Sequence, residues 1–194
     1  MDIIYVERDI ENHPRTKEIL GKFSNSHLIM IESYGEVFNK RNQSFRIQKK
    51  NPALILAKKH FNFVLPTPKG FGMRGYKNFY FSHMFNCIYD CQYCFLQGMY
   101  SSANYVIFVN FEDFGNKICE EILLSGKQKL SFFSGYDCDS LALEGITGFV
   151  DFILPLFKNH PNALLELRTK SIQINPLMST EPIANCVVAY SLLP

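Results

Sequence analysis

Three cysteines lie close together near the middle of the 194-residue chain, at Cys87, Cys91 and Cys94. Their spacing is Cys-x3-Cys-x2-Cys, so a stretch of eight residues carries three thiols. A loop of this size can direct three thiolates at three irons of an iron–sulfur cube, which leaves the fourth iron for another ligand. The cysteines therefore predict a metal centre with one open coordination position.

Zinc is the alternative metal for such a loop. A structural zinc site takes four protein ligands, usually as two close pairs, whereas this chain has three close cysteines. The next cysteine, Cys119, falls in a predicted helix, and both Cys119 and Cys186 are expected to be core residues. A zinc-stabilised module that binds nucleic acid stays open as the alternative to iron–sulfur chemistry.

Alternating strands and helices must position this loop. We expect strands at residues 78–85, 129–133, 163–167 and 187–190, and helices at 112–124 and 146–157. Residues 34–52, which are polar and basic, are expected to form a loop, and 183–184 a short helical link. The alternation predicts an α/β fold with a parallel sheet and right-handed crossovers, in which functional residues gather at the carboxyl ends of the strands.

The charge is unevenly distributed along the chain. Residues 1–80 hold 14 Lys and Arg against 7 Asp and Glu, whereas residues 81–194 hold 6 against 11. The basic half could attract nucleic acid, or it could be an ordinary solvated surface. The longest apolar runs are about five residues against the ~18 that span a bilayer, and acids stand where a signal peptide would be basic. We therefore expect a cytoplasmic protein with no membrane partner.

The cysteine loop resembles the signature of the radical S-adenosylmethionine (SAM, or AdoMet) superfamily, Cys-x3-Cys-x-aromatic-Cys, with Tyr93 as the aromatic residue. This resemblance implies a 4Fe–4S cluster whose open iron chelates SAM. One electron then cleaves SAM to methionine and a 5′-deoxyadenosyl radical, which abstracts a hydrogen atom from the substrate. An electron donor such as flavodoxin or ferredoxin is implied as a partner.

Further short segments of the sequence resemble the spore photoproduct lyase family, which is a DNA repair photolyase-like family. The clearest is Cys94-Phe95-Leu96-Gln97, which follows the last cysteine of the signature. The other blocks are Tyr5-Val6-Glu7, residues 105–112, residues 139–144, Leu167-Arg168-Thr169-Lys170 and Ala189-Tyr190-Ser191-Leu192. The resemblance implies a carbon–carbon lyase that repairs a thymine lesion, with DNA as a candidate partner.

The same resemblance suggests which residues bind SAM. Tyr93 would pack near the adenine, and Asp139, Lys170 and Ser191 match positions that hold the polar groups of SAM. Ser140, beside Asp139, belongs to the same expected set. Taken singly, each of these polar residues is more typical of a solvated loop or a cap than of a ligand site. Together, in order after the cysteine loop, they favour the site.

The sequence departs from the lyase pattern at the step that returns a hydrogen atom to the product. The family uses a cysteine after its second barrel strand, where this chain has Tyr136, and Cys138 follows two residues later. Phe95 replaces the tyrosine after the third cluster cysteine. Tyr136 and Cys138 are therefore the candidate catalytic residues, and an inactive remnant of a radical SAM enzyme stays an alternative.

The number of strands bears on the completeness of the barrel. Radical SAM cores resemble a partial (β/α)6 TIM-like barrel, and about four of its six strands can be assigned before the sequence ends at Pro194. We expect a basic α/β extension at residues 1–77 and an incomplete barrel core at 78–194. A parallel strand ending there would leave an open edge, so we expect the N-terminal part of a longer protein, or a chain that needs a partner.

Overall fold

The computed structural model describes residues 1–192 and divides into two compact units. The first unit comprises Met1–Lys59 and Met84–Val109, and the second comprises His60–His83 and the chain from Asn110 onward. Each unit is therefore built from two separate segments of the sequence. The division at residue 77 into an extension and a barrel core stays a prediction, and Pro194 lies outside the described residues.

A five-stranded sheet with the order β2-β1-β3-β7-β6 forms the centre of the first unit. Its strands are β1 (Ile3–Glu7), β2 (His27–Ile31), β3 (Leu54–Ala57), β6 (Met84–Phe85) and β7 (Tyr105–Phe108). The first four strands in this order are parallel, and β6 is antiparallel to β7. Every residue of β3 and β7 is buried, as expected for the continuous apolar runs of central parallel strands.

Short helices connect the first three strands of this unit along the chain. They are a 3-10 turn at Arg8–Ile10, α1 (Pro14–Gly21), α2 (Gly35–Phe38) and α3 (Phe45–Gln48). The expectation of a plain loop at residues 34–52 was therefore wrong, because α2 and α3 both lie inside it. Long-range contacts stabilise these single turns: Phe38 packs against Phe85 and Tyr100, and Gln48 accepts a hydrogen bond from the backbone N–H of Ala103.

The second unit has a sheet with the order β10-β9-β8-β5-β4. Its strands are β4 (Leu65–Pro66), β5 (Lys77–Phe81), β8 (Leu130–Ser134), β9 (Ala163–Thr169) and β10 (Cys186–Tyr190). Strands β5, β8, β9 and β10 are parallel, and β4 is antiparallel to β5. This confirms the predicted α/β class with a parallel sheet of four strands in sequence order. No closed barrel forms within residues 1–192.

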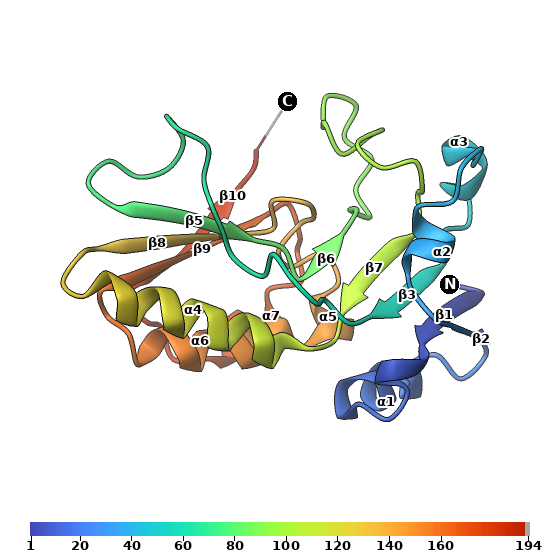
Figure 1. Ribbon diagram of the computed structural model, residues 1–194, viewed down its shortest axis with the longest axis horizontal. Coiled ribbons are helices and arrows are strands. Elements are labelled where there is room, and N and C mark those ends of the chain that lie inside the picture. The colour runs from blue at the N-terminus through green and yellow to red at the C-terminus, as the bar shows by residue number, and fades with distance from the viewer. Residues whose placement is uncertain (193–194) are drawn as a thin grey trace. The chain divides into compact units, whose positions relative to one another are not determined.

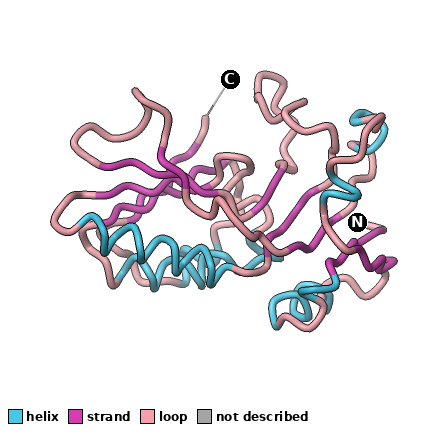
Figure 2. The backbone as a smooth tube through the Cα atoms, in the orientation of Figure 1, coloured by secondary structure: helices cyan, strands magenta, loops and turns pink. Residues whose placement is uncertain are grey.

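Two long helices, α4 (Phe111–Ser125) and α6 (Phe149–Lys158), run side by side along one face of the second sheet (Figure 1). There are also two shorter helices: α5 (Glu144–Thr147) directly precedes α6 in the chain, and α7 (Asn175–Ser179) follows β9. Figure 2 shows the same alternation of helix and strand along the backbone. None of the helices in the described part of the chain is both long and apolar enough to cross a membrane.

The alternation of side chains along β5 and β8 separates the two faces of this sheet. Phe79 and Phe132 stack with ring centroids 5.3 Å apart, and Phe132 also meets Phe157 of α6 at 5.6 Å. Burial of one such side chain contributes roughly 1.5–3 kcal/mol to folding. Because successive side chains point to opposite faces, Tyr80 and Phe133 project away from the helices. The face opposite α4 and α6 is therefore available for a site.

Further expected elements differ from the structure. Residues 78–85 do not form one strand: β5 ends at Phe81, and β6 begins at Met84 in the other sheet. The chain turns at His83, whose buried ring stacks on Phe149 with centroids 3.9 Å apart and an interplanar angle of 3°. The expected helical link at 183–184 is also wrong, because the helix lies at Asn175–Ser179, where Pro176 occupies the first turn and suits a helix start.

Candidate metal and cofactor sites

The three cluster cysteines lie in the long loop that joins β6 to β7, in the first unit (Figure 1). All three are half-buried, and the six cysteines of the chain carry thiols rather than disulfides. Two tight turns shape the loop: the N–H of Cys94 donates to the carbonyl of Cys91, and the N–H of Gln97 donates to the carbonyl of Cys94, both at 3.0 Å. The second and third cysteines are thus held on one local turn.

Asn86 closes the base of this loop. It has a left-handed backbone (φ 66°), which asparagine tolerates better than most residues. Its buried side-chain amide donates to the carbonyls of Ser102 and Asn104 at 2.7 and 2.8 Å, and so joins the two ends of the loop. Sequence reasoning missed this residue, and its position directly before Cys87 was the available signal.

The pKa of a buried tyrosine, Tyr105, is raised by its burial and by negative charges near the first cysteine. Burial raises the pKa of Tyr105 in β7, and the nearby charges of the Cys87 thiolate and the Asp90 carboxylate raise it further. By contrast, the side chains of Tyr93 and Phe95 are 58% and 59% exposed. Tyr93 is thus accessible to a ligand, although its expected role against adenine stays a prediction.

The donor set of the loop fits an iron–sulfur cluster. Thiolates are soft ligands that select iron–sulfur clusters, zinc or Cu(I) over harder cations, and three of them leave one iron of a cube open. Among residues 1–192, no group of three or more His, Cys, Asp or Glu side chains is arranged around a position for a metal ion. The fit therefore rests on the chemistry of Cys87, Cys91 and Cys94 and on the shape of their loop.

The other two cysteines expected in the core are half-buried in the second unit. The thiol of Cys119 on α4 lies 3.7 Å from Nε2 of His160. Burial raises the pKa of the Cys186 thiol, at the start of β10, to about 11. Because thiolates are the metal-binding form of cysteine, Cys186 is a poor ligand at neutral pH.

Asp139 is the centre of a polar network in the second unit. Its Oδ1 accepts hydrogen bonds from Oγ1 of Thr169 at 2.6 Å and from the N–H of Leu141 at 3.0 Å. Its Oδ2 accepts from the N–H of Lys170 at 2.6 Å. The carboxylate is buried, so these bonds tie the loop after β8 to the carboxyl end of β9. Its expected contact with SAM stays a prediction.

Lys170 and Ser191 are joined directly. The ammonium of Lys170 donates to the carbonyl oxygen of Ser191 at 2.8 Å and to its Oγ at 3.2 Å. The N–H of Ser191 in turn donates to the carbonyl of Thr169 at 2.9 Å. The structure thus brings Asp139, Lys170 and Ser191 together at the carboxyl ends of adjacent strands, where parallel-sheet topology favours ligand sites.

The loop after β8 carries the remaining expected residues. Ser140 is buried, with its Oγ 2.6 Å from Oγ of Ser134, and Cys138 is buried nearby. Gly135 permits this arrangement, because it has a φ of 77° and a Cβ there would lie 2.6 Å from Oγ of Ser140. Unlike Ser140 and Cys138, the side chain of Tyr136 is exposed, with 44% of its surface accessible.

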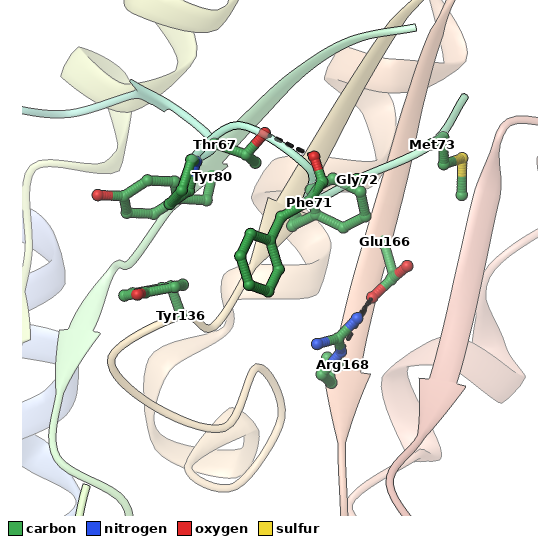
Figure 3. A pocket seen from close by; sticks show the side chains of 10 residues that line it. Thr67, Phe71, Gly72, Met73, Tyr80, Tyr136, Glu166 and Arg168 are labelled. Atoms are coloured by element: carbon green, nitrogen blue, oxygen red, sulfur yellow. Dashed lines mark hydrogen bonds and ion pairs between the residues drawn. The ribbon is translucent and has the colours of Figure 1, made fainter. Parts of the chain in front are cut away.

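A pocket of about 380 Å³ opens on the face of the second sheet opposite the long helices (Figure 3). Tyr80 and Tyr136 form one wall, with ring centroids 4.4 Å apart, and the Glu166–Arg168 ion pair at 2.6 Å forms another. The remaining lining residues are Thr67, Pro68, Phe71, Gly72, Met73 and Phe133. Of these lining residues, the sequence identified only Tyr136 as a candidate. The others have no distinguishing motif, and only the strand register shows that Tyr80, Phe133 and Glu166 lie side by side on one face.

Among the comparisons with known proteins, the one with solved structures identifies a similar fold. No family model matches the sequence, and no curated protein matches it. Solved structures of spore photoproduct lyase do match. A cysteine-to-serine mutant has a TM-score of 0.78 and 16% identity, over 92% of this chain and 52% of that chain. A double mutant with bound AdoMet and dinucleoside spore photoproduct has a TM-score of 0.76 and 17% identity, over the same shares. A lyase complexed with dinucleoside spore photoproduct has a TM-score of 0.74 and 16% identity, over 92% and 52%.

The chain has the fold of spore photoproduct lyase. The likeness extends over nearly all of this chain, and the chain spans about half the length of the solved lyase chains. At identities of 16–17% the likeness concerns the fold. In this fold the cysteine loop follows β6, and the Asp139–Lys170–Ser191 network lies at the carboxyl ends of β8, β9 and β10.

Proposed function

We propose that the protein is a radical SAM enzyme, in which Cys87, Cys91 and Cys94 hold a 4Fe–4S cluster. The observation that carries this proposal is three thiols of the radical SAM spacing on a chain with the fold of spore photoproduct lyase, one structure of which contains AdoMet. When bound, the cluster would supply the one electron that cleaves SAM into methionine and a 5′-deoxyadenosyl radical.

The residues of the second unit have proposed roles in holding SAM. The ammonium of Lys170 suits the carboxylate of SAM, and Ser191 both orients this ammonium and offers a hydroxyl. Tyr93 is proposed to pack against the adenine. Asp139 and Ser140 belong to the same set, and the hydrogen bonds of Asp139 to Thr169 and Lys170 support a role in fixing the loop that carries them.

We further propose that the substrate is a thymine lesion in DNA, which the enzyme repairs as a carbon–carbon lyase. Two of the lyase structures that match this chain contain dinucleoside spore photoproduct, which supports this choice. Tyr136 is the proposed hydrogen-atom donor to the product, through its phenolic O–H, because it is exposed at the pocket. Cys138 is the weaker candidate, since its side chain is buried.

Anaerobic reconstitution tests the proposal. Purified protein is loaded with iron and sulfide, and bound iron, visible absorption and the 5′-deoxyadenosine formed from SAM with a reductant are measured. A flavodoxin or ferredoxin is compared with a chemical reductant as the electron donor. A brown protein that forms 5′-deoxyadenosine supports the proposal, and repair of lesion-containing DNA supports the lyase assignment.

Two outcomes of this experiment contradict the proposal. A colourless protein with one zinc per chain indicates the zinc-stabilised, nucleic-acid-binding module instead. A protein that binds four irons but leaves SAM intact indicates an inactive remnant of a radical SAM enzyme. Cluster binding and SAM cleavage without lesion repair would retain the general chemistry and refute the proposed substrate.

A further inference from the structure

A lysine outside the cysteine motif contacts the cysteine loop directly. Lys49 follows α3, and its Nζ lies 3.5 Å from Oδ1 of Asp90 and 3.4 Å from Oε1 of Gln97. The side chain is 20% exposed and its ammonium lies over the ring of Phe45, 5.6 Å from the centroid. Asp90 stands directly before Cys91, and Gln97 lies three residues after Cys94, so one ammonium reaches both flanks of the last two cysteines.

The contacts of Lys49 extend across the loop. The side-chain amide of Gln97 donates to the carbonyl of Tyr89 at 3.3 Å, so the lysine, the glutamine and the backbone before Asp90 form one connected set. An exposed ion pair by itself contributes little to stability, and Asp90 is 77% exposed. The restraint on the loop therefore comes from the connected set rather than from the ion pair.

Gln48, the neighbour of Lys49, restrains the end of the same loop. Its Oε1 accepts from the N–H of Ala103 at 2.9 Å and from Oγ of Ser102 at 3.3 Å. Its own amide donates to Oε1 of Gln43 at 2.5 Å. Two consecutive residues at the end of α3 thus contact the middle and the end of the cysteine loop, while Asn86 closes its base.

The negative charge of Asp90, the partner of Lys49, is the exception in a basic part of the chain. Between residues 37 and 89 the chain has ten Lys and Arg and no Asp or Glu, and Asp90 ends this stretch. The pair of Lys49 and Asp90 is neutral as a whole and lies within the loop that carries the thiols. Net charge and hydrogen bonding around an iron–sulfur cluster set its reduction potential.

We propose that Lys49 is a positioning residue for the cysteine loop and that its pairing with Asp90 sets the local charge, and hence the reduction potential, of the cluster. The second half of this inference rests on the proposed function. Loss of the lysine leaves the Asp90 carboxylate uncompensated, which disfavours an added electron. Loss of the carboxylate leaves the ammonium uncompensated, which favours it.

Four variants test this inference: Lys49→Met, Lys49→Arg, Asp90→Asn and the control Lys50→Met, which removes an exposed neighbouring lysine. Amide hydrogen exchange of residues 87–98 is measured in the metal-free protein, and the midpoint potential is measured after reconstitution. We expect several-fold faster exchange in Lys49→Met and a more negative potential. Asp90→Asn shifts the potential in the positive direction, whereas Lys49→Arg and Lys50→Met stay close to the parent protein.

The outcomes separate this inference from the proposed function. Unchanged exchange in Lys49→Met refutes the positioning role, and potential shifts of the same sign in Lys49→Met and Asp90→Asn refute the charge role. If Lys49→Met does not fold, Lys49→Arg, which should keep the parent potential, is compared with Asp90→Asn, which should have a more positive one, and equal potentials in these two variants refute the charge role. If the parent protein binds no cluster, the proposed function fails, and the exchange measurement still decides whether Lys49 restrains the loop.

Discussion

The carboxylate of Asp139 accepts a hydrogen bond from the backbone N–H of Lys170 at 2.6 Å, while the ammonium of the same lysine turns to Ser191. Asp139 thus holds the backbone of Lys170 and leaves its side chain to another partner. This division of tasks separates two roles that sequence comparison had assigned together to SAM binding. Asp139 fixes the loops, and Lys170 carries the charge that suits a ligand.

Asp139→Asn is therefore expected to destabilise the fold. An amide in place of the carboxylate turns one acceptor into a donor that faces an N–H or hydroxyl donor, and an unsatisfied buried group costs roughly 1–3 kcal/mol. Urea unfolding followed by circular dichroism measures the loss. Asp9→Asn, at an exposed aspartate, is the control and should keep the parent stability. Equal stabilities of the two variants would contradict the structural role of Asp139.

Lys170→Met should affect SAM more than stability. Its Nζ contacts Ser191 near the end of the described chain, so its removal leaves the Asp139 bonds intact. A charge-assisted hydrogen bond is worth about 1.5–3 kcal/mol, which corresponds to a roughly tenfold to hundredfold loss of SAM affinity. Isothermal titration of reconstituted protein measures it. Lys158→Met, which removes an exposed ion pair with Glu181, should bind SAM normally.

Cys94→Ser should prevent cluster assembly. Serine is a harder and poorer ligand for iron than a thiolate, so bound iron and sulfide should fall to a small fraction of the parent values. Cys119→Ser and Cys186→Ser are the matched controls, since neither lies in the loop, and both should retain iron. Equal iron loss in a control variant would overturn the assignment of the three loop cysteines as the ligand set.

Tyr136→Phe tests the proposed return of a hydrogen atom. The variant keeps the ring that packs against Tyr80 and loses the phenolic O–H. We expect SAM cleavage without substrate to continue at the parent rate, while repair of lesion-containing DNA falls at least tenfold. Cys138→Ser should repair DNA at close to the parent rate, because that side chain is buried. The reverse pattern would identify Cys138 as the donor.

The four parallel strands of the second unit were predictable because their apolar runs and turn residues are local signals. The break at Ser82 and His83 was not, since residues 78–85 form one aromatic run that is typical of a single strand. What divides this run is a long-range contact, the stacking of His83 on Phe149. Similarly, α3 has no helical periodicity, and its contacts to residues 102–103 exist only in the folded chain.

The sequence predicted the positions of those candidate site residues that are placed by the order of the strands alone. Asp139, Lys170 and Ser191 follow successive strands, so a parallel sheet brings them to one edge. The direction of their side chains depends on the paths of the loops, which Gly135 and the Ser134–Ser140 contact determine. The pocket at Tyr80 and Arg168 was not predictable, because it requires the register of three strands and the path of residues 67–73.

Two buried ionisable groups of the second unit should give opposite dependences of stability on pH. Burial lowers the pKa of His83 to about 3 from its ordinary 6.5, and within residues 1–192 neither ring nitrogen has a hydrogen-bond partner. Between pH 6.5 and 3 the unfolded chain binds more protons at this residue than the folded chain. His83 therefore reduces stability as pH falls, by at most about 1.4 kcal/mol per pH unit.

Glu144 has the opposite effect. Burial raises its pKa to about 7 from 4.5, although the N–H of Val150 donates to its Oε1 at 2.9 Å. Between pH 4.5 and 7 the folded chain binds more protons at this carboxyl than the unfolded chain, so stability increases as pH falls. The two contributions have similar slopes and opposite signs between pH 4.5 and 6.5, and they should largely cancel in the parent protein.

Removal of one group should reveal the other. His83→Phe keeps an aromatic ring against Phe149, and its free energy of unfolding should rise as pH is lowered from 6.5 to 4.5. Glu144→Gln should instead lose stability over the same interval, because the uncompensated histidine remains. Urea titrations of both variants and the parent at three pH values measure the slopes. Parallel curves for all three proteins would show that neither group is buried in the ionisation state that the structure implies.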